Sequence, residues 1–306
     1  GVFLAGQAGP GATNTVTGLA QAKAAFSPVV SLAGAISSEQ EGKDAFQEVD
    51  QQSLFTPVTK KSFKISDTKD IHSVMQEAFK VAITPRMGPV NINLPRDVMG
   101  KTSDFQDPMK YQIDKLPEAK VSSLMKAVEL LTKAKNPVII VGAGIKNNSS
   151  HETVLALAEL IKAPCCTSPG HGDALPFEHP LNAGQMGPRG NVVASRLVKE
   201  ADVILVLGSR LGFNSTFYSY DNINKDASII HCEIDENSIG RYFPVEIGIF
   251  ADAKTVAEQL LTMLKSHQAK NEAQQWVDDF QAERKAYLEN RDQDADVTST
   301  PIQPSG

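Results

Sequence analysis

The sequence predicts an α/β protein built from two doubly wound, parallel-sheet domains. Short apolar runs alternate with segments of helical periodicity, which is the pattern of strand–helix–strand units. This alternation is interrupted once, by residues 98–120, which lack periodicity and are rich in Lys, Asp, Pro and Gln. The length of 306 residues also suggests two domains, at about 100–200 residues per domain.

The first alternating series occupies residues 1–97. Its expected strands are Val2–Ala5, Pro28–Ala33 and Val90–Leu94. Its expected helices are Thr13–Ala25 and Ile71–Ile83. Apolar residues in the second helix recur with the period of an amphipathic helix. An apolar strand that begins at residue 2, with no Met before it, indicates a piece of a longer protein. We therefore expect these residues to be the later part of a domain.

The second series occupies residues 121–265. Its expected strands are Pro137–Val141, Pro164–Thr167, Asp202–Leu207, Ser228–Ile234 and Ile247–Phe250. Its expected helices are Ser122–Lys133, His151–Ile161, Asn191–Glu200 and Ala253–Leu264. Five short strands with interleaved helices predict a complete Rossmann-like domain.

Residues 266–306 are expected to contain one polar helix followed by a disordered end. Ala273–Asn290 is polar with a single apolar stripe of Trp276, Phe280 and Tyr287. Asp292–Gly306 is poor in hydrophobic residues, which favours disorder.

Composition excludes several functional classes. The net charge of −6 argues against a broad nucleic-acid surface, which would need a basic stripe. No run approaches the ~18 apolar residues of a membrane span, so no membrane partner is expected. Cys165, Cys166 and Cys232 show neither a disulfide framework nor zinc-ligand spacing and are interpreted as small hydrophobic residues. No metal site is predicted within the chain. Three cysteines without a disulfide framework are consistent with a reducing cytoplasm.

The first candidate site is a glycine-rich turn between the first strand and the first helix. Its candidate ligand-binding residues are Gly9, Pro10, Gly11 and Asn14. Glycines let a ligand approach the backbone closely, and the helix N-terminus behind them offers free N–H groups. The spacing fits neither a dinucleotide fingerprint nor a P-loop, so a purely structural turn is an equal alternative.

Two further segments of the first domain carry polar candidates. Gly42–Asp50 is a polar loop with one large aromatic residue, Phe46, followed by Gln47. A solvated loop anchored by Phe46 is the alternative there. Arg86 lies between two prolines before the strand Val90–Leu94, where it could also be a surface charge.

The second domain places its candidates after strands. Open α/β sheets bind ligands at the carboxyl ends of their strands. The candidates at or near such ends are Gly142, Gly144, Arg189, Gly190, Asn191, Ser209, Arg210 and Asp235. His171 follows a strand and could face a nucleotide, whereas His231 lies inside a strand and is expected to be packed.

Four ordered motifs resemble one family. The runs G-P-G-A-T-N, D-A-F-Q-E-V-D, P-V-T-K and R-x-G-P-V resemble the pyrimidine-binding domain of acetolactate synthases, and the similarity continues to about Leu264. The family has three domains. The resemblance implies that residues 1–97 are the later part of the pyrimidine-binding domain and 121–265 the central nucleotide-binding domain. Residues 266–306 would then lead towards a third domain.

The resemblance implies a thiamine-diphosphate- and Mg²⁺-dependent transferase. Such a carboligase decarboxylates pyruvate and joins the product to a second 2-keto acid, as in branched-chain amino acid biosynthesis, and works as a homodimer or tetramer. Phe46 and Gln47 would border the substrate path. FAD or an ADP-type nucleotide would contact Arg86, Arg189, Gly190, Asn191, Arg210 and Asp235. The family's catalytic Glu precedes the G-P-G motif and its metal motif follows the third domain's start, so the fragment alone is expected to be inactive.

Two alternatives remain open. Gly208–Gly212 and the run from Ile247 to Lys254 are similar to sulfoacetaldehyde acetyltransferase, a relative that uses the same thiamine chemistry. The loop at Phe46 and Gln47 instead favours acetolactate synthase. The other alternative is a non-catalytic module that binds FAD or ADP through residues 121–265.

Overall fold

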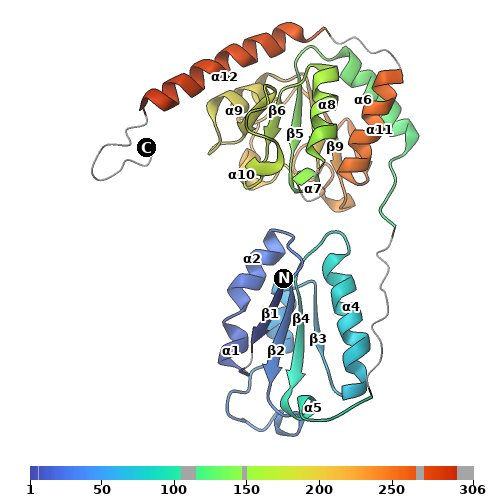
Figure 1. The fold of residues 1–306 in the computed structure, drawn as a ribbon, viewed down its shortest axis with the longest axis vertical. Helices are drawn as coiled ribbons and strands as arrows, with labels where there is room; N and C mark the ends of the chain where they lie inside the picture. Colours follow the sequence, from blue (N-terminus) through green and yellow to red (C-terminus); the bar gives the residue numbers. More distant parts are fainter. Residues whose placement is uncertain (6, 105–114, 147–149, 267–271, 295–306) are drawn as a thin grey trace. The chain divides into compact units, whose positions relative to one another are not determined.

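Contacts divide the chain into two compact units. The computed structural model describes residues 1–5, 7–104, 115–146, 150–266 and 272–294. The units are Gly1–Lys115 and Leu116–Gly306. Each contains one parallel sheet with helices on both faces, so the predicted fold class is confirmed (Figure 1). Within the described ranges, every helix is too short or too polar to cross a bilayer.

The first unit has a four-stranded sheet in the order β1-β2-β4-β3, and all its pairings are parallel. Its strands are β1 (Val2–Ala5), β2 (Val30–Ala35), β3 (Lys61–Lys64) and β4 (Val90–Pro95). Its α-helices are α1 (Pro10–Thr13), α2 (Val16–Ala24), α3 (Gln51–Phe55), α4 (Ile71–Ile83) and α5 (Arg96–Met99). Short 3-10 turns are η1 (Ser38–Gln40), η2 (Thr56–Val58) and η3 (Thr68–Asp70).

Alternation along β2 and β4 divides the core of this unit between two faces. Val30, Val90 and Ile92 pack with buried alanines of α4. Ala33 packs on the other face with residues of α2 and α3, including Leu19. The sheet is therefore covered on both sides, with α2 and α4 on opposite faces (Figure 1).

The second unit has a six-stranded parallel sheet in the order β10-β9-β8-β5-β6-β7. Its strands are β5 (Pro137–Val141), β6 (Cys165–Thr167), β7 (Asn182–Gln185), β8 (Val203–Leu207), β9 (Ser228–Glu233) and β10 (Ile247–Phe250). Its α-helices are α6 (Val121–Lys133), α7 (Ala143–Lys146), α8 (His151–Ile161), α9 (Val192–Glu200), α10 (Phe213–Thr216), α11 (Ala253–Ser266) and α12 (Gln274–Asp294). The 3-10 turns are η4 (Gly172–Ala174) and η5 (Glu236–Ser238).

Strands β5 and β8 form the centre of this sheet and are buried along their whole length. Ile139 and Leu205 face a core made with α6, α8 and α11. Val138 and Ile204 face the opposite core, where residues of α9 meet Phe280 of α12. Continuous apolar strands are what a parallel sheet with two covered faces requires.

Two strands were missing from the sequence prediction, and both lie at sheet edges. β3 has an exposed lysine at each end and a single buried residue, Phe63, and β7 contains Gly184 with polar neighbours. Short, polar edge strands carry little of the hydrophobic pattern by which strands are recognised. The second sheet accordingly has six strands where five were expected.

Several element bounds also differ from the prediction. The helix expected at Thr13–Ala25 is divided into α1 and α2 at Asn14 and Thr15, where Thr15 bonds back to Ala12 through both its N–H and its hydroxyl. The strand expected at Pro28–Ala33 lies two residues later, as β2. β8 begins after Asp202, whose carboxylate accepts backbone N–H bonds from Lys135 and Asn136.

The stretches expected to be irregular contain described helices at their margins. Helix α5 extends from Arg96 to Met99, into the expected linker, and residues 105–114 lie outside the described residues. Helix α12 extends to Asp294, and its Trp276 and Phe280 are buried as the stripe predicted. The expected disordered end, from residue 295 onward, lies outside the described residues.

Candidate functional site

In the first unit, the glycine-rich turn packs directly against the polar loop that follows β2. Gly9 has a φ of 57°, in the left-handed region, and Pro10 occupies the first turn of α1. A Cβ atom at Gly9 would lie 2.5 Å from the carbonyl oxygen of Gln47. The turn that carries Gly9, Pro10, Gly11 and Asn14 therefore lies beside the loop that carries Gln47.

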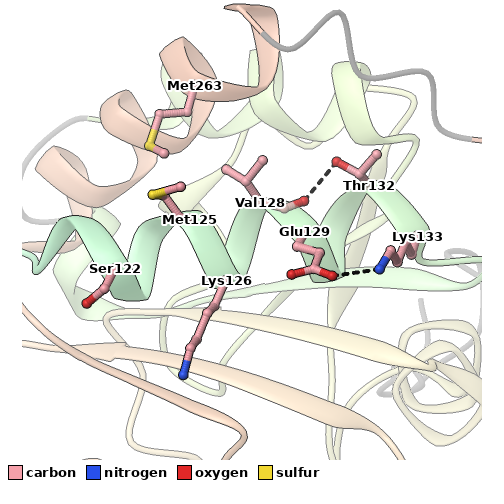
Figure 2. A pocket seen from close by; sticks show the side chains of 8 residues that line it. All are labelled: Ser122, Met125, Lys126, Val128, Glu129, Thr132, Lys133 and Met263. Atoms are coloured by element: carbon pink, nitrogen blue, oxygen red, sulfur yellow. Dashed lines mark hydrogen bonds and ion pairs between the residues drawn. The ribbon is translucent and has the colours of Figure 1, made fainter.

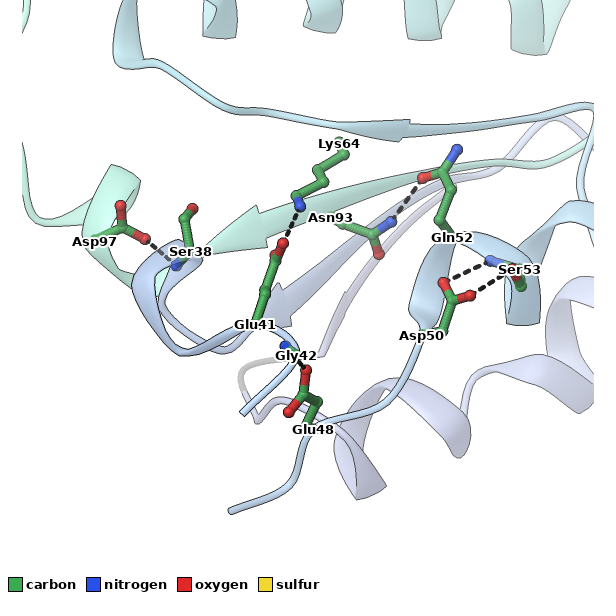
Figure 3. Close-up of polar contacts among 10 residues, drawn as sticks. All are labelled: Ser38, Glu41, Gly42, Glu48, Asp50, Gln52, Ser53, Lys64, Asn93 and Asp97. Atoms are coloured by element: carbon green, nitrogen blue, oxygen red, sulfur yellow. Dashed lines mark hydrogen bonds and ion pairs between the residues drawn. The ribbon is translucent and has the colours of Figure 1, made fainter. Parts of the chain in front are cut away.

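The loop itself is held by a carboxylate. Glu48 accepts a hydrogen bond from the backbone N–H group of Gly42 at 2.5 Å (Figure 3). It accepts a second from the backbone N–H group of Ala45 at 3.0 Å. The bond from Gly42, and next the bond from Ala45, lower the pKa of the Glu48 carboxyl below its ordinary value. Gln47 has a left-handed φ of 66° and Phe46 is 88% exposed. Glu48 thus folds the loop so that Phe46 projects into solvent.

Helix α3 continues from this loop and is fixed at its N-terminus and along one side. Asp50 caps it by accepting from Ser53 N at 3.1 Å and from Ser53 Oγ at 2.5 Å. Gln52 accepts from Asn93 Nδ2 of β4 at 3.2 Å (Figure 3). These contacts tie the Phe46–Gln47 loop to the sheet through α3.

Arg86 is held within the first unit. Its guanidinium carbon lies 4.2 Å from the centre of the Phe26 ring, a cation–π geometry. Neither Phe26 nor this stacking was visible in the sequence, because the two residues are far apart in the chain.

The carboxyl edge of the second sheet contains a topological switch point. With its strands numbered in chain order, the sheet reads 3-2-1-4-5-6, so the order reverses between β5 and β8. Ligands of open α/β sheets bind outside the carboxyl ends of the strands at such a point. Gly142 directly follows β5, and Gly208 directly follows β8.

The loops on the two sides of the switch point touch each other. A Cβ atom at Gly142 would lie 2.4 Å from the carbonyl oxygen of Gly208, and one at Gly144 would lie 2.8 Å from Gly208 Cα. Ser209 Oγ lies 2.6 Å from Ser168 Oγ, and this pair is buried. The structure therefore brings together three of the predicted residues, Gly142, Gly144 and Ser209.

The predicted residues after β7 have mainly structural surroundings. A Cβ atom at Gly190 would lie 2.2 Å from the carbonyl oxygen of Gln185. Asn191 is the N-cap of α9, and its side chain accepts from Ala194 N at 2.7 Å. Arg189 is exposed. Of these candidates, only Arg189 presents its side chain to solvent.

Two other predicted residues follow β8 and β9. Arg210 is exposed at the end of the β8 loop. The Asp235 carboxylate accepts from Ser238 Oγ at 2.9 Å and from Asn237 N at 3.2 Å, which starts η5. Asp235 therefore shapes the loop after β9 and is half-buried there.

The two histidines of this edge differ. His231 is buried, with Nε2 2.8 Å from the Ser209 carbonyl oxygen and Nδ1 accepting from Gly240 N at 3.3 Å. The expectation that it is packed is confirmed. His171 lies in the loop after β6, and its Nδ1 is buried with no hydrogen-bond partner among the described residues.

An aromatic cluster that the sequence prediction did not include follows Arg210. Phe213 stacks on Phe217 with ring centres 4.7 Å apart, and Tyr218 lies 4.5 Å from Tyr242. Phe217 and Tyr218 both have left-handed φ angles, which is unusual for residues other than glycine. The cluster is partly exposed, with Phe213 at 51%.

An open groove of about 620 Å³ lies on the outer side of α6 (Figure 2). It is lined by Met125, Val128 and Glu129 of α6 and by Met263 of α11, among others. None of the predicted site residues lines it. Within the described part of the chain, no three His, Cys, Asp or Glu side chains are grouped so that they could hold a metal ion.

Two family models match the chain, and together they cover more than half of it. Residues 1–54 match the N-terminal TPP binding domain of thiamine pyrophosphate enzymes, and residues 124–260 match the central domain of the same enzymes. The chain belongs to the thiamine pyrophosphate enzyme family. The predicted recognition is confirmed at this level, and the two matched regions lie in the first and second units.

Several curated members of the thiamine pyrophosphate enzymes are similar over most of the chain. A probable acetolactate synthase large subunit of Methanocaldococcus jannaschii is 36% identical over 303 residues, which are 97% of this chain and 50% of the relative. The acetolactate synthase large subunit of Corynebacterium glutamicum is 37% identical over 91% of this chain and 45% of its own length. A sulfoacetaldehyde acetyltransferase of Rhodobacter capsulatus is 36% identical over 86% of this chain and 44% of its own length. The chain thus spans about half the length of these relatives.

Proposed function

We propose that the chain is part of a thiamine-diphosphate-dependent carboligase that decarboxylates pyruvate and joins the product to a second 2-keto acid. The observation that carries this proposal is the packing of Gly9 against the carbonyl oxygen of Gln47. It places the turn proposed to hold the aminopyrimidine next to the loop proposed to border the substrate. When bound, thiamine diphosphate with its Mg²⁺ supplies the electron sink for decarboxylation of a 2-keto acid.

Phe46 and Gln47 would act by position, because neither side chain titrates near neutral pH. Phe46 is 88% exposed within this chain, so its ring is available to exclude water from a substrate. Gln47 offers an amide donor and an acceptor. The bonds of Glu48 to Gly42 and Ala45 would set the direction in which both project.

The test is Gln47→Ala in the full-length protein. Misplacing a substrate by ~1 Å can reduce turnover ~100-fold, whereas truncation of a half-buried polar loop side chain with little packing should change stability by no more than ~0.5 kcal/mol. We expect kcat/KM for carboligation to fall strongly with an unchanged melting temperature. Gln40→Ala, at an exposed position of η1, is the matched control. Unchanged kinetics with a lowered melting temperature would make Gln47 purely structural.

For the 306-residue chain alone, we propose no carboligase activity. Its sequence contains no G-D-G run followed by an Asn, the diphosphate–metal motif that the resemblance implies. Incubation with pyruvate, thiamine diphosphate and Mg²⁺, followed by an acetolactate assay, should give no product. Turnover at an ordinary enzymatic rate would contradict this. In the full-length protein we propose a homodimer or tetramer.

We also propose that the second unit binds FAD or an ADP-type nucleotide at its switch point. Thr167 Oγ1, at the end of β6, and His171 Nδ1 are buried and without hydrogen-bond partners among the described residues, which fits a polar ligand at this edge. The loops after β5 and β8 meet beside these atoms at Gly142 and Gly208, where the strand order reverses. A flavin would appear as an absorbance band near roughly 450 nm after incubation with FAD and gel filtration. Binding of ADP without the band would identify the ADP-type ligand.

The sequence after β8 favours a second candidate reaction. Gly208–Gly212 is similar to the corresponding run of sulfoacetaldehyde acetyltransferase, and a relative of that name is 36% identical. Comparing consumption of pyruvate and of sulfoacetaldehyde by the full-length protein separates the two. A higher kcat/KM for sulfoacetaldehyde would replace the acetolactate synthase proposal.

A further inference from the structure

Charged groups from three segments surround His171 at the carboxyl edge of the second sheet. Lys146 ends α7, His171 follows β6, and Arg210 follows β8. The positive charges of Lys146 and Arg210 both act on the His171 ring, and the negative charge of Asp173 opposes them. Lys146 Nζ lies 2.9 Å from the Asp173 carboxylate. Among the described residues, Lys146, Asp173 and Arg210 are the charged groups that act on the His171 imidazole.

The His171 ring is held in place by its backbone. Its N–H donates to the Ser168 carbonyl at 3.0 Å, and its own carbonyl accepts from Ala174 N at 3.0 Å. Nδ1 is buried, and no described residue offers it a hydrogen bond. The loop backbone at His171 is therefore held on both sides, and the half-buried imidazole has one nitrogen without a hydrogen-bond partner among the described residues.

In the free protein this position disfavours the imidazolium ion. Burial, and next the charge of Lys146, lower the pKa of His171 below its ordinary value of 6.5, while Asp173 raises it and Arg210 lowers it. A phosphate group would reverse the balance, because its negative charge stabilises a protonated imidazole and its oxygens accept from the ring N–H groups.

We propose that a phosphate group binding at this edge is coupled to proton uptake by His171, with Lys146 and Arg210 as the fixed cations. The inference rests on the proposed nucleotide-binding function and adds to it a proton-linked phosphate contact. The proton comes from solvent, and no covalent bond changes. The ligand class is a phosphate or diphosphate ester.

The sign of the pH dependence follows from linkage. His171 is neutral in the free protein above its lowered pKa and protonated in the complex below its raised pKa. Affinity therefore increases as pH falls through the pKa of the complex and levels off below the pKa of the free protein. Each unit that separates the two pKa values contributes about tenfold in affinity.

The experiment is calorimetric titration of the 306-residue chain with ADP, in two buffers of different ionisation enthalpy, between pH 5.5 and 8.5. The terminal phosphate of ADP titrates with a pKa of roughly 6 and exchanges protons in every variant. We therefore expect the wild type to take up more protons on binding than His171→Gln does, and we expect this difference to carry the part of the pH dependence that is due to His171. His72→Gln, on α4 of the other unit, is the control and should behave as wild type. Inorganic pyrophosphate serves as a second titrant. If the adenine base contributes to binding, ADP should bind tightly and inorganic pyrophosphate should not, which separates a nucleotide ligand from a free phosphate.

The outcomes separate the two proposals. ADP binding with the same proton uptake in His171→Gln would overturn the inference and leave nucleotide binding intact. Absence of ADP and FAD binding at every pH would overturn both. If His171→Gln does not fold, Asp173→Asn and Lys146→Met decide the matter at exposed or half-buried positions.

These two variants should act in opposite directions. Asp173→Asn removes a negative charge and should tighten ADP binding several-fold, whereas Lys146→Met removes a positive charge and should weaken it several-fold. A merely structural role of the Lys146–Asp173 pair would make both substitutions alike, because either one breaks the pair. Equal shifts of the same sign would therefore overturn the phosphate contact.

Discussion

The candidate loops of the two units are held in place by different forces. In the second unit, the loops after β5 and β8 meet backbone to backbone, so closely that a Cβ atom at Gly142 would lie 2.4 Å from the Gly208 oxygen. In the first unit, the loop that carries Phe46 and Gln47 is held by the Glu48 carboxylate. Steric contact makes the loops of the second unit sensitive to added volume. Carboxylate bonding makes the loop of the first unit sensitive to protonation.

The largest expected effect is that of added volume at the switch point. Gly142→Ala should lower the free energy of unfolding by about 1–3 kcal/mol, because the backbone of Gly208 must move. Gly212→Ala is the control in the same edge, since a Cβ atom there would contact nothing within 4 Å. Urea denaturation of both variants measures the difference. Equal losses would show that volume is not what the Gly142–Gly208 contact restricts.

A smaller effect is expected from acid on the second unit. Burial lowers the pKa of His231 below 6.5, and the bond to the Ser209 carbonyl opposes this. The unfolded chain then binds the proton more readily, so stability is full above about pH 6.5 and falls as pH drops below it, by at most ~1.4 kcal/mol per pH unit. Urea midpoints between pH 7.5 and 5 measure this slope. His231→Gln should show a smaller change of urea midpoint with pH. A slope identical to that of the wild type would contradict the conclusion that His231 causes it.

The first unit should respond to acid locally and at lower pH. Backbone bonds lower the pKa of Glu48 below 4.5, so the contribution of this carboxylate is present above that value and is lost as pH falls through the lowered pKa. The amide NMR signals of Gly42 and Ala45 should shift together in that range. Glu48→Gln should abolish the joint shift, whereas Glu39→Gln, on exposed η1, should leave it unchanged. Independent shifts of the two amides would contradict a shared carboxylate.

The smallest expected effect concerns how tightly the two cores of the second unit are closed. Cys165, Cys166 and Cys232 are free and buried, and burial raises the pKa of Cys165 to about 12. Thiolates, the reactive forms, are therefore scarce and enclosed. Iodoacetamide should label none of the three in the native protein and all three in urea. Labelling of a native cysteine at neutral pH would show that the core opens.

Sequence patterns were sufficient for the central elements of each sheet. β5 was predicted residue for residue, and β4 differs by one residue, because continuous apolar runs mark strands buried on both faces. Edge strands such as β3 lacked that signal. Their positions depend on pairing with β4, which only the assembled sheet provides.

The sequence identified the glycines of the candidate site more completely than its charged residues. Gly142 and Gly9 were identified from turn chemistry, but their partners, Gly208 and Gln47, are distant in sequence. Lys146 was not singled out, because an isolated lysine at a helix end is usually a solvated surface group. Its relation to His171 arises only when the loops after β5 and β6 become neighbours in the sheet.

The shared direction of all six strands in the second unit has an evolutionary consequence. Loop positions at the carboxyl edge that lie outside the Gly142–Gly208 contact can change without altering strand pairing, so ligand preference can diverge while the scaffold stays constant. The run Gly208–Gly212, which resembles sulfoacetaldehyde acetyltransferase, extends from that contact into the loop after β8. The acetolactate synthase of Corynebacterium glutamicum and the sulfoacetaldehyde acetyltransferase of Rhodobacter capsulatus are about equally similar to this chain, at 37% and 36% identity. Exchanging the segment after β8 between such relatives is expected to change ligand preference without changing strand pairing.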